Sequence, residues 1–414
     1  MHYILFLVNP LWAFLKAMKN LLNRNALIVF ILFYGLYGYA ISFELTTSDS
    51  YRIGARFCQT DFSWWLVWQM YQEGALTDVY LIFVYSILKL FTDNPKILYG
   101  ILGLVMGLFA GLSIRQLYTI WKGKRNKFFY LIVLFYFLSI SFFNLQTTRF
   151  FTATSIFSYF AIQYLYFGQK KALIGVFITP LFHFGYLAAV FALIVYVFEA
   201  RWFRSTKLCY WMMAIAFTMY LAMPQSAIDN IMEGEEETET FSSNALNKKY
   251  NTYSRATDKV SEASYHKEVS TYRQANNAYK KVNNYINKIG MFLLLTALYR
   301  RRKRIVQTEK QKKFFNYVLY SYAVGYMASL FFSSGSRFVI LASMFFSFWF
   351  LTIFRNNNNY ITRRYCWLLI PINFYSISFF FFNVTRMVTP LFWFAPPIFT
   401  IIDGIGFEPI DFIY

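Results

Sequence analysis

Residues 172–198 read ALIGVFITPLFHFGYLAAVFALIVYVF and contain no Asp, Glu, Lys or Arg. Two apolar segments, 172–182 and 185–198, meet at one histidine, His183. Segments this apolar are typical of a bilayer interior, and their length suits the two arms of a short hairpin. The stretch therefore predicts paired transmembrane helices, and it places a titratable ring where they join.

The whole chain has the same apolar character. Of its 414 residues, 57% are hydrophobic and 23% aromatic, which is more aromatic surface than a soluble domain could bury. Apolar segments recur between short charged patches, and this predicts an all-α, polytopic integral membrane protein. We expect about eleven transmembrane helices, at 26–43, 97–119, 128–144, 149–167, 172–182, 185–198, 208–223, 289–299, 314–332, 338–354 and 366–382. The stretch 391–402 is cut by Pro396 and Pro397 and is expected to insert only partly.

Basic residues gather in clusters at alternate ends of these spans. The clusters are Lys16/Lys19/Arg24, WKGKRNK (121–127), GQKK (168–171), EARWFRSTK (199–207), RRRKR with KQKK (300–313) and FRNNNNYITRR (354–364). All fall on one side, which is therefore the cytoplasmic side, with the N-terminus inside and the C-terminus outside. The net charge of +20 is thus explained by cytoplasmic loops, and no nucleic-acid partner is expected.

Three segments are expected to lie outside the regular spans. Residues 79–91 are apolar, but a crossing there would move the 121–127 cluster outside, so we expect a re-entrant or interfacial helix; the alternative is a hairpin with 62–73. Residues 1–25 are expected to form an interfacial helix. Residues 224–288 are expected to form an extracytoplasmic helical insert, whose tyrosine stripe at 265, 272 and 279 either packs on the membrane domain or covers a sugar site.

These expectations divide the chain into four parts. The interfacial helix (1–25) precedes a first transmembrane bundle over 26–223, which has an outer loop at 44–96. The insert (224–288) separates it from a second bundle with an outer C-terminal segment, over 289–414. Cys58, Cys209 and Cys366 lack metal-ligand spacing, and no phosphate-binding glycine loop or HExxH motif occurs, so no metal or cofactor is expected.

A few cations depart from the positive-inside pattern. Outside the 224–288 insert, seven lie on the predicted outer half: Arg52, Arg56, Lys89, Lys96, Arg149, Arg337 and Arg386. The planar guanidinium group suits phosphate, although an arginine can also reach lipid headgroups simply by snorkelling. Arg149 and Arg337 stand in turns between closely spaced spans, which favours the bundle interior, and Arg52 lies beside Asp49. His183 shares their predicted depth.

A carboxylate, an imidazole and several guanidinium groups at one depth indicate chemistry on an anionic, lipid-linked substrate. The arginines would bind a pyrophosphate, while the carboxylate or the imidazole would deprotonate an attacking hydroxyl group. The pyrophosphate could then leave without help from a metal. Taken alone, His183 is better explained as a hydrogen-bonded structural histidine.

The same residues carry a family resemblance. The order SDSYRIGARF (48–57), TDNP (92–95), NLQTTRFF (144–151) and PLFHFGY (180–186) resembles the EpsG family of bacterial exopolysaccharide proteins, relatives of the Wzy-type polysaccharide polymerases. The similarity covers residues 40–200, and Arg337 resembles a later family arginine. Phe150 stands where the family has Gln, and Phe184-Gly185 replaces its polar pair after the histidine, so the substrate is left open.

The resemblance implies an architecture, an activity and site residues. It implies a GT-C-like membrane glycosyltransferase in the bacterial plasma (inner) membrane that polymerises polyprenyl-pyrophosphate-linked repeat units of exopolysaccharide, capsule or O-antigen at the outer face. His183 and Asp49 would be catalytic, His183 as a base or as a substrate hydrogen-bonder, and Arg149, Arg337 and Arg52 would bind pyrophosphate. Candidate sugar contacts are Glu73, Asp78, Asn144 and Tyr51.

Partners and alternatives follow from the same reading. A flippase and a chain-length regulator would be partners besides the lipid-linked oligosaccharide and the bilayer. The competing classes are a lipid-linked oligosaccharide flippase, which would need cations through the whole bilayer, and an integral membrane acyltransferase, whose donor would arrive from the cytoplasm.

Overall fold

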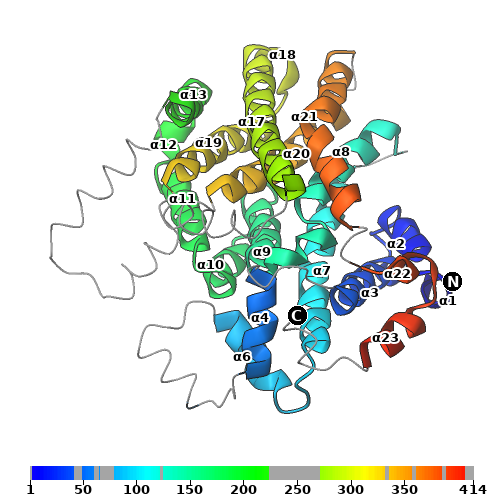
Figure 1. Cartoon of the computed structure of the whole chain (residues 1–414). Helices are drawn as coiled ribbons and strands as arrows, with labels where there is room; N and C mark the ends of the chain where they lie inside the picture. The colour runs from blue at the N-terminus through cyan, green and yellow to red at the C-terminus, as the bar shows by residue number, and fades with distance from the viewer. Residues whose placement is uncertain are drawn as a thin grey trace. The chain divides into compact units, whose positions relative to one another are not determined.

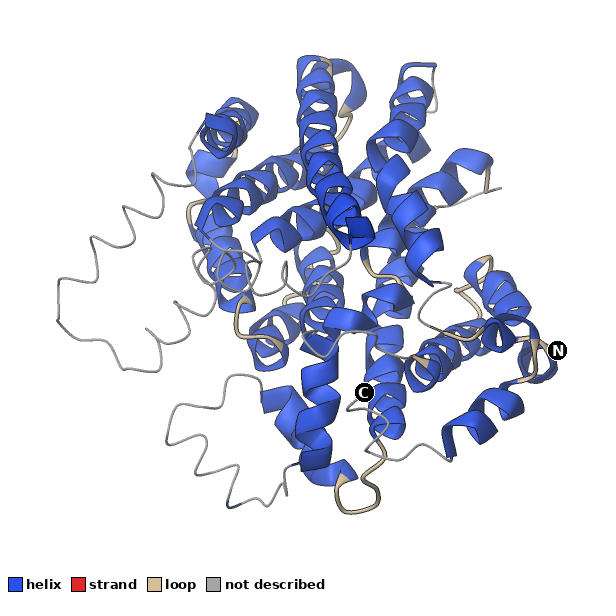
Figure 2. Ribbon diagram, in the orientation of Figure 1, coloured by secondary structure: helices blue, strands red, loops and turns tan. Residues whose placement is uncertain are grey.

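The regular structure of the protein is helical throughout the part described (Figure 1, Figure 2). The computed structural model describes residues 2–41, 49–59, 65, 79–121, 125–222, 271–331, 335–356, 360–384 and 388–405. The chain divides into two compact units. Unit 1 is Met1–Val190 with Ser376–Tyr414, and unit 2 is Phe191–Tyr375.

Unit 1 contains twelve described elements and shares two helices with unit 2. Its own elements are α1 (His2–Val8), α2 (Pro10–Met18), α3 (Arg24–Ala40), α4 (Asp49–Gln59), α6 (Val79–Leu88), α7 (Pro95–Ile120), α8 (Lys127–Ser139), the 3₁₀ helix η1 (Phe142–Thr147), α9 (Thr148–Leu165), α10 (Ala172–Phe182), α22 (Pro390–Phe394) and α23 (Pro397–Ile405). The boundary between the units falls within α11 (Tyr186–Phe198) and α21 (Tyr360–Val384). Unit 2 adds α12 (Ala200–Phe203), α13 (Thr206–Ala222), α17 (Thr271–Arg300), α18 (Arg302–Ile305), α19 (Glu309–Phe331) and α20 (Ser336–Asn356).

Each of the predicted spans overlaps a described helix. Among the described residues, three stretches are long and apolar enough to cross a bilayer by length and composition: Pro95–Ile120, Lys127–Leu165 and Arg337–Arg355. Shorter apolar helices include Arg24–Ala40, Ala172–Phe182 and Tyr186–Phe198. The chain is therefore a helical membrane protein, and the number of eleven crossings stays a prediction.

The stretch Lys127–Leu165 is not one straight rod. Tyr136 OH on α8 lies 3.5 Å from Ser158 Oγ on α9. Twenty-two residues of continuous helix would separate these groups by roughly 33 Å. The chain therefore folds back at η1, as two separate predicted segments, 128–144 and 149–167, require.

The core of unit 1 is the close pairing of α3 with α7. A Cβ at Gly38 would overlap the carbonyl oxygen of Tyr99, and a Cβ at Gly103 would overlap that of Tyr34. Small residues allow two backbones to approach in this way, which is a common solution for helix pairs in membranes. Phe142 of η1 packs its ring against α3 and the C-terminal segment, with ring centroids 4.7 Å from Tyr37 and 6.2 Å from Trp393.

The termini of unit 1 form short helices rather than long ones. The expected interfacial helix over 1–25 is divided into α1 and α2 at Asn9-Pro10, where Asn9 Oδ1 accepts the Trp12 N–H at 2.8 Å. The proline-broken stretch 391–402 likewise forms α22 and α23. Helix α6 has 10 residues, roughly 15 Å, which is half the thickness of a hydrocarbon core. Its length suits the re-entrant or interfacial helix predicted at 79–91; the hairpin partner 62–73 lies almost wholly outside the described residues.

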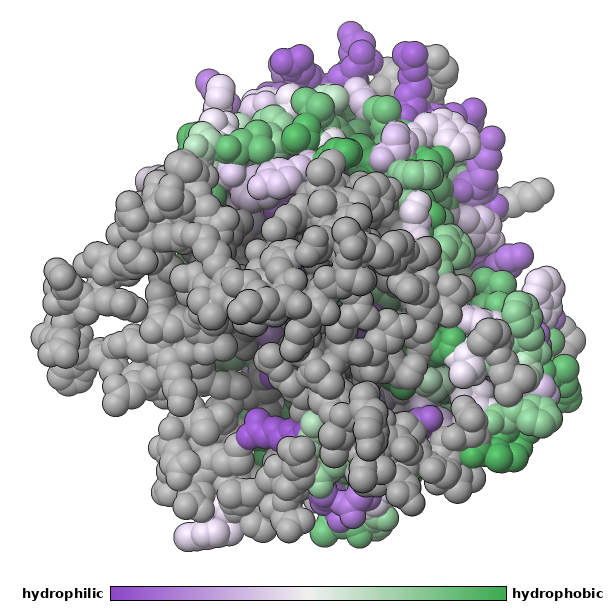
Figure 3. Space-filling model, in the orientation of Figure 1, coloured by the Kyte–Doolittle hydropathy of each residue, from purple (hydrophilic) through white to green (hydrophobic). Residues whose placement is uncertain are grey.

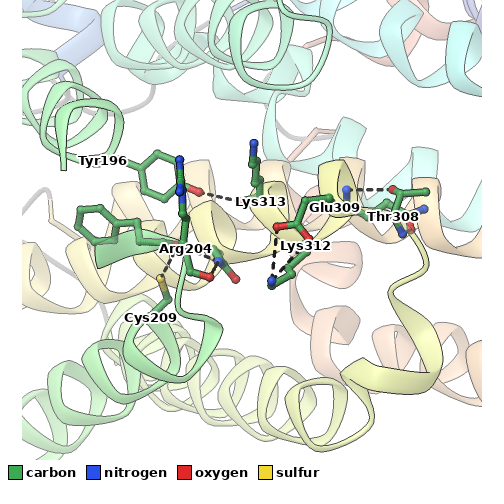
Figure 4. A network of polar contacts seen from close by, with 10 residues as sticks. Tyr196, Arg204, Cys209, Thr308, Glu309, Lys312 and Lys313 are labelled. Atoms are coloured by element: carbon green, nitrogen blue, oxygen red, sulfur yellow. Dashed lines mark hydrogen bonds and ion pairs between the residues drawn. The ribbon is translucent and has the colours of Figure 1, made fainter. Parts of the chain in front are cut away.

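Unit 2 is built from α13, α17, α19 and α20. The Tyr210 and Tyr299 rings stack at 4.0 Å, which joins the start of α13 to the end of α17. Asn316 Nδ2 donates to the carbonyl oxygens of Phe203 and Arg204, at 2.7 and 3.2 Å, and so fastens α12 onto α19. In Figure 4, Arg204 and Lys313 project to the same side, while Lys312 points toward Glu309, 3.4 Å away.

One end of unit 2 is strongly hydrophilic. Figure 3 shows hydrophilic residues gathered over α18 and the start of α21, above an apolar band. Two of the basic clusters predicted to be cytoplasmic, 199–207 and 300–313, lie close together in unit 2, because the Tyr210–Tyr299 stack joins the helices that follow and precede them. Helix α17 begins within the predicted insert, at Thr271, and continues through the predicted span to Arg300 without a break. The tyrosines at 265, 272 and 279 lie outside the residues whose side chains are described.

Candidate functional site

Segments that are far apart in sequence converge in unit 1. Helix α4, which begins at Asp49, packs against η1 and α7. Its backbone is held by side chains, since the Gly54 N–H donates to Tyr99 OH at 2.9 Å and Tyr85 OH donates to the Ile53 carbonyl at 3.1 Å. Helix α6 contacts α10 through the rings of Tyr80 and Phe182, 4.6 Å apart. The segments SDSYRIGARF, NLQTTRFF and PLFHFGY thus belong to one packed region.

His183 forms the turn between α10 and α11. It ends α10 in an extended conformation and is 6% exposed. Its carbonyl oxygen accepts the Tyr186 N–H at 2.9 Å, and its ring Nδ1 accepts the Gly185 N–H at 3.1 Å. A side chain that accepts the N–H two residues on caps the start of a helix. His183 therefore ends one helix and caps the next.

This hydrogen bond determines the state of the imidazole ring. Nδ1 must carry a lone pair to accept from Gly185, so a neutral His183 holds its proton on Nε2. In that tautomer the distal nitrogen is a hydrogen-bond donor rather than a base. The geometry favours the substrate hydrogen-bonder over the general base among the two roles that the sequence left open.

Aromatic packing fixes the orientation of the ring. The Phe150 ring meets His183 edge-on, with centroids 5.3 Å apart and an interplanar angle of 84°. The fully buried Tyr186 packs on the other two rings and shares a short hydrogen bond with Thr154 Oγ1 on α9. A Cβ at Gly185 would lie 3.0 Å from His183 Cε1. Arg149 directly precedes Phe150 on α9, so its backbone lies one residue from the ring that contacts His183.

Arg149 is half-buried in the first turn of α9. On either side of it along the chain, Thr148 and Thr152 have buried hydroxyl groups that find no hydrogen-bond partner among the described residues. The Tyr80 hydroxyl, whose ring contacts Phe182, is also buried without a partner in the described part of the chain. Buried polar groups are almost always hydrogen-bonded, so three such hydroxyl groups near His183 and Arg149 are consistent with a polar ligand.

The other predicted site residues are distributed as follows. Asp49, Tyr51 and Arg52 lie in the first turns of α4, but their side chains are outside the described set. Asn144 is half-buried in η1, and its Nδ2 donates to the Ser139 carbonyl at 3.2 Å. Glu73 and Asp78 fall outside the described residues. Arg337 belongs to unit 2, in the first turn of α20, where it is half-buried.

One ionisable residue was missed by sequence reasoning. Lys288 was counted with the polar insert, but in the structure it is a 2%-exposed residue inside α17. The pattern YINKIGM, in which apolar residues flank a single lysine, was a signal that this position lies within a helix face. Within the described residues, no group of three or more His, Cys, Asp or Glu side chains could hold a metal ion.

Comparison with known proteins assigns no function to these residues. The chain matches no family model, no curated protein and no solved structure, so its function has to be argued from the site.

Proposed function

We propose that this membrane protein is a polysaccharide polymerase that joins polyprenyl-pyrophosphate-linked repeat units at the outer face of the bacterial plasma membrane. The observation that carries the proposal is the His183 turn. It is a buried imidazole whose tautomer is set by Gly185, packed on Phe150 beside Arg149. The family resemblance supplies the sugar chemistry, and the GT-C-like architecture and the eleven crossings belong to the same proposal.

The reaction is a glycosyl transfer that needs no metal. The acceptor hydroxyl oxygen bonds to the anomeric carbon of the growing glycan while the bond from that carbon to the pyrophosphate oxygen breaks. The leaving pyrophosphate takes the electron pair, and Arg149, with Arg52 as a further candidate, stabilises its charge. The proton of the acceptor passes to Asp49, because Nδ1 of His183 is already engaged.

His183 would act through its Nε2–H. A donor at this nitrogen can orient a sugar oxygen or a phosphate oxygen, and it needs no change of protonation during the reaction. The unpartnered hydroxyl groups of Thr148, Thr152 and Tyr80 are suited to sugar hydroxyls near the same turn. Asn144, Tyr51, Glu73 and Asp78 remain candidate sugar contacts.

The deciding experiment is an analysis of lipid-linked glycans in a deletion strain. A polymerase defect leaves single repeat units on their lipid carrier, exposed on the outer face and with no longer chains. Chains of normal length would refute the proposal. Single units trapped on the inner face would indicate the competing function, a flippase.

Complementation with paired variants tests the site. Arg149→Ala and His183→Ala should reproduce the deletion, whereas Arg24→Ala on the exposed start of α3 and His2→Ala in α1 should restore long chains. Protein abundance has to be measured in each strain. Long chains with Arg149→Ala present at normal level would remove Arg149 from the site.

A further inference from the structure

The ammonium group of Lys288 is buried in a cluster of tyrosines in unit 2. Its Nζ lies 3.0 Å from Tyr220 OH and 4.2 Å from the centroid of the Tyr220 ring. The Tyr285 and Tyr326 rings pack on Tyr220 at 5.9 and 6.2 Å. We call Lys288, Tyr220, Tyr285 and Tyr326 the Lys288 cluster.

The depth of this cation in the bundle is unusual. Lys288 lies twelve residues before Arg300 on the same helix, roughly 18 Å from the basic end of unit 2. If the basic end lies at the headgroups, this places the ammonium group beyond the middle of a hydrocarbon core ~30 Å thick. A charged side chain at that depth is costly and is, by default, a candidate for a functional site.

Neighbouring contacts hold the lysine firmly in position. Asn287 Nδ2 donates to the Ile372 carbonyl of α21 at 3.0 Å, and Tyr326 OH donates to the Lys288 carbonyl at 3.2 Å. Two residues further along α17 the packing is equally close, since a Cβ at Gly290 would lie 2.9 Å from the Ile372 side chain. A charge held on so rigid a backbone is suited to binding, because little order has to be created when a ligand arrives.

Arg337 lies at the same end of unit 2. Gly325 precedes Tyr326 on α19, and a Cβ at Gly325 would lie 3.0 Å from the Val339 backbone nitrogen on α20. The start of α20 is equally close to α19, because a Cβ at Gly335 would overlap the Ala328 carbonyl. The close approach of α19 and α20 therefore brings the first turn of α20, with Arg337, to the level of Tyr326 and the Lys288 cluster.

We propose that the Lys288 cluster and Arg337 form an anion-binding site for phosphate or pyrophosphate oxygens at this end of unit 2. The ammonium group donates to the anion, the guanidinium group of Arg337 adds a second cation, and Tyr220 positions Nζ through its hydroxyl and its ring face. Insofar as the ligand is the pyrophosphate of a lipid carrier, the inference rests on the proposed function. It assigns a binding role to Lys288, which the sequence predicted to belong to the extracytoplasmic insert at 224–288.

The test is a titration of the purified full chain in lipid nanodiscs with inorganic pyrophosphate, followed by thermal unfolding. The wild-type protein should be stabilised, and Lys288→Met should bind pyrophosphate roughly tenfold or more weakly, the usual scale for a lost charged hydrogen bond. Lys313→Met, an exposed lysine at the opposite end of α19, should bind as the wild type does. Equal affinities for wild type and Lys288→Met, or no stabilisation of the wild type, overturn the inference.

Two further arms make the result decisive. If Lys288→Met does not fold, the Tyr220→Phe variant is measured instead. Removing the hydroxyl group that holds Nζ should weaken pyrophosphate binding several-fold, and an unchanged affinity overturns the inference. Polyprenyl pyrophosphate and free pyrophosphate are compared to distinguish a lipid carrier from a soluble anion. If the deletion strain makes glycan chains of normal length while Lys288→Met binds pyrophosphate more weakly, only the polymerase proposal is refuted. If the deletion strain makes short chains while Lys288→Met binds pyrophosphate as the wild type does, only the anion site is refuted.

Discussion

Replacing Gly185 by alanine is the sharpest perturbation of the candidate site. The added Cβ would lie 3.0 Å from Cε1 and 3.1 Å from Nδ1 of His183. Ordinary van der Waals contact begins near 3.4 Å, so the ring has to move by a few tenths of an ångström. Phe150 and Tyr186 pack on the same ring, which limits how it can move. The displacement therefore has to stretch or tilt the hydrogen bond that sets the tautomer.

The expected cost is larger for activity than for stability. Overpacking of a buried position typically costs ~1–3 kcal/mol, and we expect the lower end because a ring tilt relieves the contact. A displaced reacting group can lower a rate by roughly 10²-fold when the displacement approaches 1 Å, so about tenfold is expected here. The assay is the rate of chain elongation per folded protein on a purified lipid-linked repeat unit, together with the unfolding temperature.

Gly168→Ala provides the matched control. Gly168 has φ +75° in the turn between α9 and α10, with no atom within 4 Å of an added Cβ. Alanine in this left-handed conformation costs ~1–2 kcal/mol of stability without moving His183. If Gly185→Ala lowers activity no more than Gly168→Ala does at an equal loss of stability, the reasoning about the ring position is wrong.

Three other changes test separate features of the structure. His183→Asn should keep the helix cap, because asparagine can accept the Gly185 N–H. It should lower the rate of chain elongation by roughly 10²-fold, because the distal ring nitrogen is lost. Elongation at the wild-type rate would show that His183 serves only as a cap. Gly38→Ala should cost ~3 kcal/mol or more, since its Cβ would meet the Tyr99 backbone, and an unchanged unfolding temperature would contradict the close α3–α7 pairing. Burial raises the pKa of the Cys58 thiol, and the charge of Lys89 partly opposes this by lowering the same pKa. Alkylation of Cys58 at pH 8 should therefore be slower than alkylation of free cysteine, and slower still in Lys89→Gln. Faster alkylation in Lys89→Gln would exclude the lysine's influence.

The helices were predictable from sequence because apolar length is a local property. A long apolar segment in lipid has to satisfy its own backbone hydrogen bonds, and a single segment does this as a helix without help from its neighbours. The breaks were local as well, since Asn9-Pro10 and the proline pair at 396–397 interrupt helices through missing N–H groups and ring clashes. The burial of Lys288 was not predicted, because its polar neighbours on the N-terminal side concealed the fact that one helix runs from Thr271 to Arg300.

The sequence by itself determined an all-helical membrane protein with basic clusters at the ends of its helices, and it predicted that His183 and Arg149 serve one site. Only the tertiary structure decided that Nδ1 of His183 accepts the Gly185 N–H, that Phe150 packs against the ring, and that Lys288 lies inside an aromatic cluster. The physical reason is that composition and periodicity act over a few turns of one chain segment. Tautomer, ring orientation and the burial of a charge depend on contacts such as that of α9 with α11 or of α13 with α17, which no local pattern encodes.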